Sequence, residues 1–551
     1  MSRAPARSDH PASFGTLLRQ IAGLLALLSG AVDSPLVAQD SARADPVGPV
    51  VGRVELARQN IFADSEATFF LPRLVNRFHI TTRPYVIERE FLFAQDLPLG
   101  PDALEETARN LRRLGVFRQV DVDTVRRGSS LVVRVETRDG WSTKPELSFR
   151  STGGQTAWRA SLYEENLFGT ASRLGLGYEK DPDRTSGVFS FSQPRLISNS
   201  IGLGAYVEDR SDGTLLGASI VRPFLSFNDR YGWQAGFDIR DERVLRYFEG
   251  ETLPRDTLFR NYDAVAVSFG TAVKLRTRVF HRASIYGRVW RDDYSTPDSA
   301  AVEPRVTQGA IGLGWEFRRS RYVVVRGFAA ARDEDVDLST SVRANLGYTP
   351  EIFGHAEGGF VAGLGFRYAG VLESEKAFAY LDLIANGRFT SGGLDSGSVN
   401  TGVTVWFTPY EKASMVAHIG AGFLENPRPG GEFDLGLGLG PRGYRLHAFS
   451  GDRAVNASIE YRYMALKDFI KVFDLGVGLF YDWGGAWYDG SPSRYGWDAG
   501  IGLRIGPSRS TDVLLSRIDL VYRGRTDQDP SDWLIVIGRG LTFSTASMLS
   551  H

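Results

Sequence analysis

The residues best suited to chemistry lie in two short motifs near the C-terminal end of the chain. The first is Pro441-Arg442-Gly443-Tyr444, in a long Gly-rich segment, and the second is Phe480-x-Asp482-x-Gly484, at the end of an expected strand. An arginine presents a planar fork of donors that can bind a carboxylate through two hydrogen bonds, which a lysine cannot do. The two motifs therefore supply the partners for a charge-assisted ion pair.

The motifs of common enzymes are incomplete in this chain. Gly436-x-Gly438-x-Gly440 lacks the following Lys and Ser/Thr of a phosphate-binding loop. His418 and His447 accompany no Ser or Cys motif that would form a nucleophile–base pair. The chain has no Cys, and its seven His show no ligand spacing. We therefore expect no enzyme activity, no metal and no cofactor.

The segments around these motifs alternate between apolar and polar residues. Along residues 454–463 the apolar face holds Val455, Ala457, Ile459, Tyr461 and Tyr463. Residues 473–484 repeat the pattern, with Asp482 on the polar face. A period of two indicates a half-buried strand, and a soluble β-sandwich would share it. Here the pattern recurs over about 400 residues without a helical period, with Tyr and Trp near strand ends, which is typical of a transmembrane β-barrel with a polar lumen.

An (aliphatic)-Arg-Gly-(aromatic) loop followed by Phe-x-Asp-x-Gly resembles the outer-membrane assembly and translocation barrels of the BamA/TamA family, although Pro441 replaces the aliphatic residue. The resemblance implies that Arg442 lies in a loop folded into the lumen and pairs with Asp482, forming a lumen lock. Strand alternation also turns Glu460 inward, which makes it a second candidate partner. We expect a wet lumen to screen this pair. We also expect the loop to be too rich in glycine to be held by packing.

Further charged residues of the last strands are expected to line the lumen as a network of opposite charges. These are Arg462, Asp498, Arg504, Arg517 and Asp519.

The first 38 residues are typical of a secretory signal. Three arginines precede an apolar run, Ile21 to Val32, and a small residue, Ala38, offers a cleavage point. The run is about twelve residues long, too short for a membrane-spanning helix of roughly twenty. Residues 39–49 are expected to form a linker.

Residues 50–140 change to a mixed pattern of the order β-α-α-β-β. With the run from Leu114 to Phe117 and the closing Thr137 to Trp141, this segment resembles a single POTRA domain, and a generic small α+β domain is the alternative. We expect Phe117 to Asp123 to be an edge strand, anchored to the helices by Phe117, Val120 and Val122. An unpaired strand edge can accept an extended client as an added strand.

The expected fold is an all-β transmembrane barrel over residues 141–543, preceded by this one small α+β domain. The family norm is sixteen strands, whereas about twenty alternating segments can be counted, so both numbers stay open. The long connections, Glu242 to Asn261, Asp292 to Arg305 and Leu424 to Ser450, should lie on the outer side, with residues 424–450 folded inward. A tail, 544–551, follows the barrel.

The last strand resembles the C-terminal recognition signal of outer-membrane barrels. The residues that carry the resemblance are Gly538, Leu541 and Phe543.

The resemblance implies a protein of the bacterial outer membrane, with the POTRA domain in the periplasm. Such a protein inserts β-barrel proteins into that membrane or translocates a polypeptide across it. Its partners would be an unfolded client, the bilayer, and periplasmic chaperones or accessory proteins. The net charge of −1 implies no nucleic-acid partner. A passive pore, a lipid-exporting channel and a purely structural surface antigen are the alternatives.

Overall fold

The computed structural model describes residues 48–63, 70–128, 130–152, 155–197, 200–226, 229–276, 278–296, 306–326, 333–373, 376–436, 440–508 and 515–540. The signal segment, Leu541, Phe543 and the C-terminal tail lie outside the described residues. The chain divides into two units, Met1–Gly48 and Pro49–His551, and the description below concerns the second unit.

The N-terminal domain is a three-stranded sheet with helices. Its elements are β1 (Val51–Gln59), α2 (Phe70–Phe78), α3 (Pro84–Glu88), α4 (Ala103–Arg113), β2 (Phe117–Arg127) and β3 (Ser130–Asp139). The strand order is β1-β3-β2, with β1 parallel and β2 antiparallel to β3. The short helix α3 adds one element to the expected order, because Pro84 sits at a helix N-terminus where its missing N–H costs nothing.

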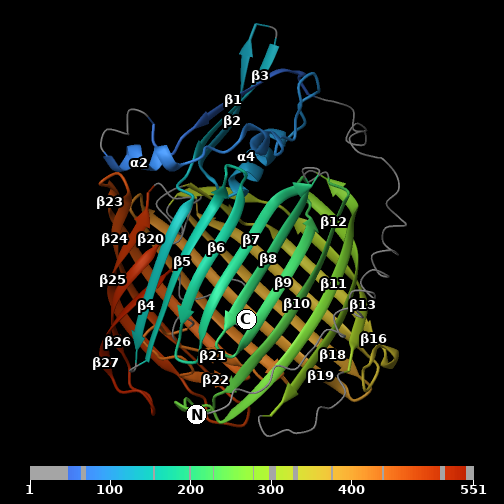
Figure 1. The fold of residues 1–551 in the computed structure, drawn as a ribbon, viewed down its shortest axis with the longest axis vertical. Helices are drawn as coiled ribbons and strands as arrows, with labels where there is room; N and C mark the ends of the chain where they lie inside the picture. The colour runs from blue at the N-terminus through green and yellow to red at the C-terminus, as the bar shows by residue number, and fades with distance from the viewer. Residues whose placement is uncertain are drawn as a thin grey trace, which may run out of the picture. The chain divides into compact units, whose positions relative to one another are not determined.

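Twenty antiparallel strands close into a barrel after this domain (Figure 1). In chain order they are β4 (Thr143–Thr152), β5 (Gln155–Leu167), β6 (Ser172–Lys180), β7 (Thr185–Ile197), β8 (Ile201–Arg210), β9 (Gly213–Arg222), β10 (Tyr231–Arg246), β11 (Asp256–Arg276), β12 (Val279–Ser295), β13 (Gln308–Arg319), β16 (Thr340–Thr349), β17 (Gly359–Glu373), β18 (Ala377–Thr390), β19 (Gly393–Tyr410), β20 (Ala413–Glu425), β23 (Arg453–Phe469), β24 (Phe473–Trp487), β25 (Gly496–Pro507), β26 (Ser516–Arg523) and β27 (Asp532–Arg539). The choice between sixteen and twenty strands is therefore settled at twenty.

The barrel has an apolar outer face and a polar inner face. On β24, Leu479 and Tyr481 are 53% and 45% exposed, whereas their neighbours Phe480 and Asp482 are 6% and 1% exposed. This alternation confirms the expected strand faces, with the apolar side chains turned outward. Within the described residues, no helix is both long and apolar enough to cross a membrane.

The prediction of a long connection from Glu242 to Asn261 is wrong. Strands β10 and β11 continue through most of it, with Glu242 paired to Arg260, and the strands are joined by residues 247–255. The misreading has a physical cause. Inward positions near these strand ends carry charges that pair across strands, as Arg260 does with Glu242 and Asp292, and a charged strand end resembles a loop in the sequence.

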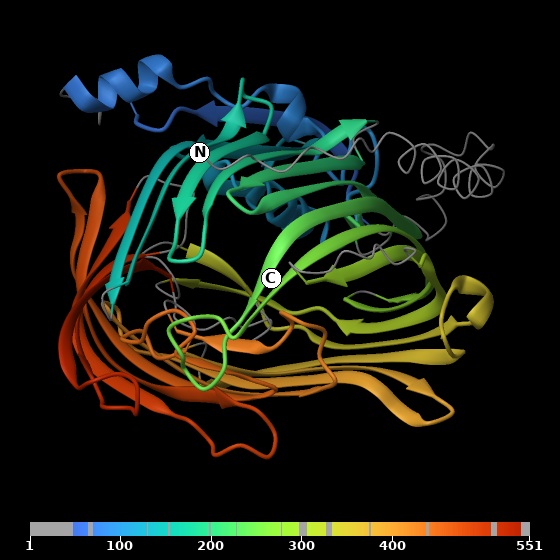
Figure 2. The ribbon, with the colours of Figure 1, turned by 60° about the horizontal axis from the view of Figure 1, so that its bottom comes forward.

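Two small hairpins and one short helix are inserted between barrel strands. The strands β14 (Tyr322–Arg326) and β15 (Asp333–Asp337) form a hairpin between β13 and β16, and a 3-10 helix η1 (Glu351–Phe353) follows β16. The strands β21 (Phe433–Leu435) and β22 (Phe449–Gly451) pair at the base of the connection between β20 and β23. Figure 2 shows the same ribbon turned by 60°, so that the end of the barrel at the bottom of Figure 1 comes forward.

Candidate functional site

The loop between β21 and β22 is held by packing as well as by charge. Tyr444 is fully buried, and it shares an apolar cluster with Phe433, Leu435 and Phe449 from the two short strands. The cluster also includes Leu424, Ala448, Ala454 and Ala486. The prediction that the loop is too glycine-rich to be held by packing is therefore wrong. The apolar side chains of this cluster are enough because they are buried against one another.

Arg442 stands at the centre of the site with each of its guanidinium nitrogens occupied. Its Nε and Nη2 donate to the Oδ2 and Oδ1 atoms of Asp482 at 2.5 and 3.2 Å. Its Nη1 donates to Asp519 at 2.9 Å, and Nη2 also reaches Glu460 at 3.3 Å. The guanidinium lies 3.6 Å from the ring centre of Phe480, which adds a cation–π contact. Arg442 is 1% exposed, so this pair is dry rather than screened by lumen water.

Three different strands present these carboxylates, because each carries an inward-facing acid at the same depth. Glu460 lies on β23, Asp482 on β24 and Asp519 on β26. Ser458, on β23, donates to Asp482 at 2.6 Å, and Arg504, on β25, donates to both Glu460 and Asp519 at 2.8 and 2.6 Å. The arrangement joins the loop to the last strands of the barrel.

Asp519 and Asp498 are the partners that the motifs alone did not identify. The Arg442 guanidinium contacts Asp519, and the backbone N–H of Gly443 donates to Asp498 at 2.8 Å. Strand alternation had placed both acids on the lumen face, so the signal was present. Strand alternation does not say how far the loop descends into the lumen. That depth decides which of several inward-facing acids Arg442 contacts.

The glycines around the lock leave room for its bulky members. A Cβ on Gly496 would stand 2.5 Å from Cζ of Tyr444, whose hydroxyl donates to the Gly524 carbonyl at 2.8 Å. A Cβ on Gly484 would stand 2.7 Å from the Val455 carbonyl oxygen. Gly436, at the start of the loop, has φ of +133° and no space for a side chain.

His447 also ties the same loop to the connection between β6 and β7. Its Nε2 lies 2.8 Å from Asp183, in the β6–β7 connection, and its Nδ1 lies 2.5 Å from Asp434. The ring stacks on Tyr247 at 3.6 Å, and Tyr247 donates to Asp183 at 2.8 Å. Burial alone would lower the pKa of His447, but Asp434 and Asp183 override it and raise the pKa to about 9.

Further contacts extend this tether. Ser450 donates to the Tyr247 carbonyl at 2.7 Å, and Arg445 donates to the Gly250 carbonyl. Arg246 pairs with Glu432 at 3.1 Å. The loop therefore links the strands near the C-terminus to the connections that follow β6 and β10.

The β14–β15 hairpin packs against inward-facing side chains at the end of the barrel that carries the N-terminal domain. In the β14–β15 hairpin and the residue after it, Val336 and Leu338 are 8% and 1% exposed and pack with Phe378 and Trp406. At its base, Tyr322 lies 4.3 Å from the Arg109 guanidinium of α4. The sequence pattern did not predict this hairpin, because the contacts that place it against Phe378 and Trp406 are between residues far apart in the chain.

The contact between β27 and β4, here called the seam, has the fewest paired residues of any two neighbouring barrel strands within the described part of the chain. Among the described residues these two strands share one registered pair, Val536 with Arg150, whereas β26 and β27 share eight. An ion pair between Arg539 and Glu146 also crosses the seam. Gly538 leaves space for Arg517, because a Cβ at position 538 would lie 2.8 Å from the Arg517 Nε.

Strand β2 lies at the edge of the N-terminal sheet, as expected. Phe117 and Val120 are 4% and 8% exposed in the domain core, and Val122 packs beside them. The side chains of Asp121 and Asp123 are exposed. The residues proposed to anchor the edge therefore face the helices, and the backbone edge is the surface on which a client strand could be added.

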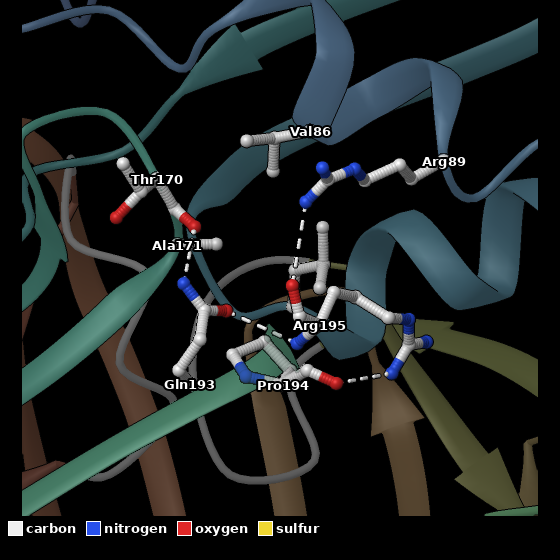
Figure 3. Close-up of a pocket in the computed structure, with 8 residues that line it drawn as sticks. Val86, Arg89, Thr170, Ala171, Gln193, Pro194 and Arg195 are labelled. Atoms are coloured by element: carbon white, nitrogen blue, oxygen red, sulfur yellow. Dashed lines mark hydrogen bonds between the residues drawn. The ribbon is translucent and has the colours of Figure 1, made fainter. Parts of the chain in front are cut away.

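The N-terminal domain is joined to the barrel by buried polar contacts. Arg195, at the end of β7, forms an ion pair with Glu90 at 2.8 Å, and Arg89 donates to the Arg195 carbonyl at 3.3 Å. Figure 3 shows Arg89 and Arg195 at a small pocket, where Gln193 also donates to the Thr170 carbonyl at 3.3 Å. The pocket is a packing gap of the joint. Within the described residues, no group of three or more acidic or histidine side chains is placed to hold a metal.

A closed antiparallel barrel with an apolar outer face, a charged interior and a small α+β domain before its first strand defines a transmembrane β-barrel protein. No protein-family model matches the chain. Over 145 residues, 24% of this chain, it is 27% identical to the outer membrane protein assembly factor BamA of Neisseria meningitidis serogroup B. The match covers 17% of that protein's length, well below two thirds. The chain is thus similar to the barrels that its motifs resemble.

Two solved structures align with most of the chain. CdiB from Escherichia coli aligns over 97% of this chain and 99% of its own, at 10% identity and a TM-score of 0.44. BamA from Haemophilus ducreyi lacking POTRA domains 1–3 aligns over 89% of this chain and 84% of its own, at 12% identity and a TM-score of 0.37.

Proposed function

We propose that the protein resides in the bacterial outer membrane and inserts β-barrel proteins into it or translocates a polypeptide across it. The N-terminal domain, as a POTRA domain in the periplasm, receives the extended client. The observation that carries the proposal is the seam, where the described residues of β27 and β4 share a single registered pair. Strands paired this sparsely can part at little cost, which exposes two edges to a client strand.

Three further features fit the same activity. Edge strand β2 offers backbone donors and acceptors to an extended chain before it reaches the barrel. The lock at Arg442 fixes the strands next to the seam, since Asp519 lies on β26, so the seam can open while the rest of the wall holds its shape. No catalytic group is needed, because strand exchange replaces one set of backbone hydrogen bonds by another.

Locking the seam tests the proposal. The chain has no Cys, so Arg150→Cys with Val536→Cys introduces one disulfide across the registered pair. The matched control is Ile518→Cys with Ile537→Cys, a registered pair of β26 and β27. We expect the oxidised seam variant to lose client insertion or secretion and to regain it on reduction, while the control stays active. Full activity with the seam oxidised would refute the proposal.

The same variants distinguish the proposed activity from that of a passive pore or lipid-exporting channel of this fold. A pore conducts through its lumen, so it keeps its activity when the seam is locked. Depletion of the protein followed by outer-membrane proteomics then separates the two proposed activities. Broad loss of barrel proteins indicates assembly, and loss of one secreted protein indicates dedicated translocation.

A further inference from the structure

Helix α2 exposes two large aromatic side chains although it belongs to a packed domain. Phe70 and Phe78 are 74% and 76% exposed, and Ile80, just after the helix, is 51% exposed. The helix is held from its other side by Asn76, which exchanges two hydrogen bonds with the backbone of Phe62, a residue that is 1% exposed. The orientation of α2 is therefore fixed, and its aromatic face is turned away from the core. Clustered exposed apolar residues mark an interaction surface.

This face is also basic. From Phe70 to Arg83 the sequence contains Arg73, Arg77 and Arg83 and no Asp or Glu. All three arginines are exposed. Phenylalanines interspersed with arginines on one exposed face are the composition of a helix that lies in a membrane interface, where rings enter the acyl boundary and guanidinium groups bind lipid phosphates.

The chain places this face at the rim of the barrel. Arg83 donates from its backbone N–H to the Gly169 carbonyl at 2.9 Å and from Nε to the Phe168 carbonyl at 3.0 Å, in the turn between β5 and β6. Phe168 is itself 62% exposed. A Cβ on Gly169 would lie 3.2 Å from the Ile80 side chain, so the exposed residues of the two segments adjoin.

The apolar outer face of the barrel extends to the end of the strands that carries the N-terminal domain. Phe469, the last residue of β23, and Ile470, in the turn to β24, are 45% and 59% exposed. Figures 1 and 2 both show α2 on the side of the barrel where this turn and β4 lie. Exposed aromatic residues at strand ends mark the membrane–water interface of such barrels.

We propose that α2, with Phe70, Phe78, Ile80 and the exposed arginines, docks onto the phospholipid surface beside the barrel and binds anionic headgroups there. The inference rests on the barrel spanning a membrane. Docking would fix the N-terminal domain next to the β4 side of the seam and hold its edge strand at a set distance from the bilayer.

The test uses the full chain in vesicles of phosphatidylcholine and phosphatidylglycerol with brominated acyl chains. The chain has no Cys, so a fluorophore is attached at Arg77→Cys on the exposed face. Leu147→Cys, at an 85% exposed outward position of β4, reports the lipid-facing wall. Val125→Cys, a 39% exposed residue on β2 near the hairpin tip that points away from the barrel in Figure 1, reports solvent.

We expect the label at residue 77 to be quenched and blue-shifted as at residue 147, and the label at 125 to be unaffected. Adding Phe70→Ser and Phe78→Ser, raising the salt or omitting phosphatidylglycerol should each reduce the quenching at 77. A label at 77 as exposed as at 125, with 147 quenched, overturns the inference and leaves the barrel assignment intact. An unquenched label at 147 overturns both. A label at 77 that is shielded only after a soluble cell extract is added assigns the face to a protein and overturns lipid docking.

Discussion

Arg442 donates two hydrogen bonds to the two carboxylate oxygens of Asp482, across forty residues of sequence, and both side chains are 1% exposed. This bidentate pair joins the inner loop to β24. Because the pair is buried, removing one partner is expected to cost more free energy of unfolding than it would in a wet lumen. A wet lumen would have screened the pair, whereas in a dry site a lone partner is left as an uncompensated charge.

Removing either partner of this pair should destabilise the barrel strongly. We expect Arg442→Ala and Asp482→Ala each to lower the free energy of unfolding by about 3–5 kcal/mol, and the double variant by less than the sum. Arg442→Lys keeps the charge but not the two-pronged hydrogen bonding, so its free energy of unfolding should lie between those of the wild type and Arg442→Ala. Thermal unfolding in detergent micelles measures the effect. Additive losses would show that the two side chains do not act as one pair.

Filling the space beside Tyr444 should displace the loop without removing any charge. In Gly496→Ala the new Cβ would stand 2.5 Å from Tyr444, so we expect a cost of about 1–3 kcal/mol and faster proteolysis of the loop. Gly370→Ala, in β17, is the control, because its nearest neighbour would be 4.0 Å away. Equal protease resistance in the two variants would mean that Tyr444 does not anchor the loop.

How far the sequence predicts this site depends on the scale of the feature. The period of two in β23 and β24 identified the lumen face, and with it the inward position of Asp482 and Glu460. The contact with Asp519 is different, because it depends on how deep the loop descends past β26. Depth follows from the packing of Tyr444 and Phe449, which no local pattern encodes.

The β14–β15 hairpin, here called the inner hairpin, and the charged strand ends also could not be predicted from local sequence patterns. No local pattern separates Tyr322–Arg326 and Asp333–Asp337 from barrel strands, and only the packing of this hairpin against Phe378 and Trp406 shows that it leaves the wall. Conversely, Glu242 and Arg260 look like loop residues until their pairing across β10 and β11 is known. In both cases the deciding contact is non-local.

The His447 tether predicts a loop that loosens in alkali. The folded pKa of about 9 lies above the ordinary value of 6.5, so the stabilisation is fully present below about pH 6.5 and is lost as the pH rises through 9. The loss is at most about 3 kcal/mol. Unfolding temperatures measured from pH 6 to 10 should fall in the wild type and stay flatter in His447→Asn. Asn suits the control because His447 has φ of +60°, a region that Asn tolerates. An equal fall in both proteins would assign the pH dependence to other groups.

Detaching the inner hairpin should open the lumen from one end. Leu338→Ala removes a side chain that is 1% exposed and should cost about 2–5 kcal/mol. We expect single-channel recordings in planar bilayers to show more frequent opening. The matched control is Val324→Ala, in the same hairpin but 58% exposed. Unchanged conductance in a folded Leu338→Ala protein would mean that the hairpin does not restrict the lumen.

The open edge of β2 can be tested with proline, which removes one backbone donor. Val120→Pro is a poor choice, because Val120 is 8% exposed in the domain core. Asp121 and Thr124 have exposed side chains and lie an odd number of residues apart, so their N–H groups point to opposite sides of the strand. One of the two therefore donates toward β3 and the other toward the open edge.

A photo-crosslinker at Asp123 measures capture of a client peptide by this edge. We expect the proline that removes the open-edge donor to reduce capture while the domain keeps its unfolding temperature. The other proline removes a hydrogen bond to β3 and should lower that temperature instead. Undiminished capture in both variants would exclude strand addition at β2, since one of the two prolines removes a backbone donor that the added strand would need.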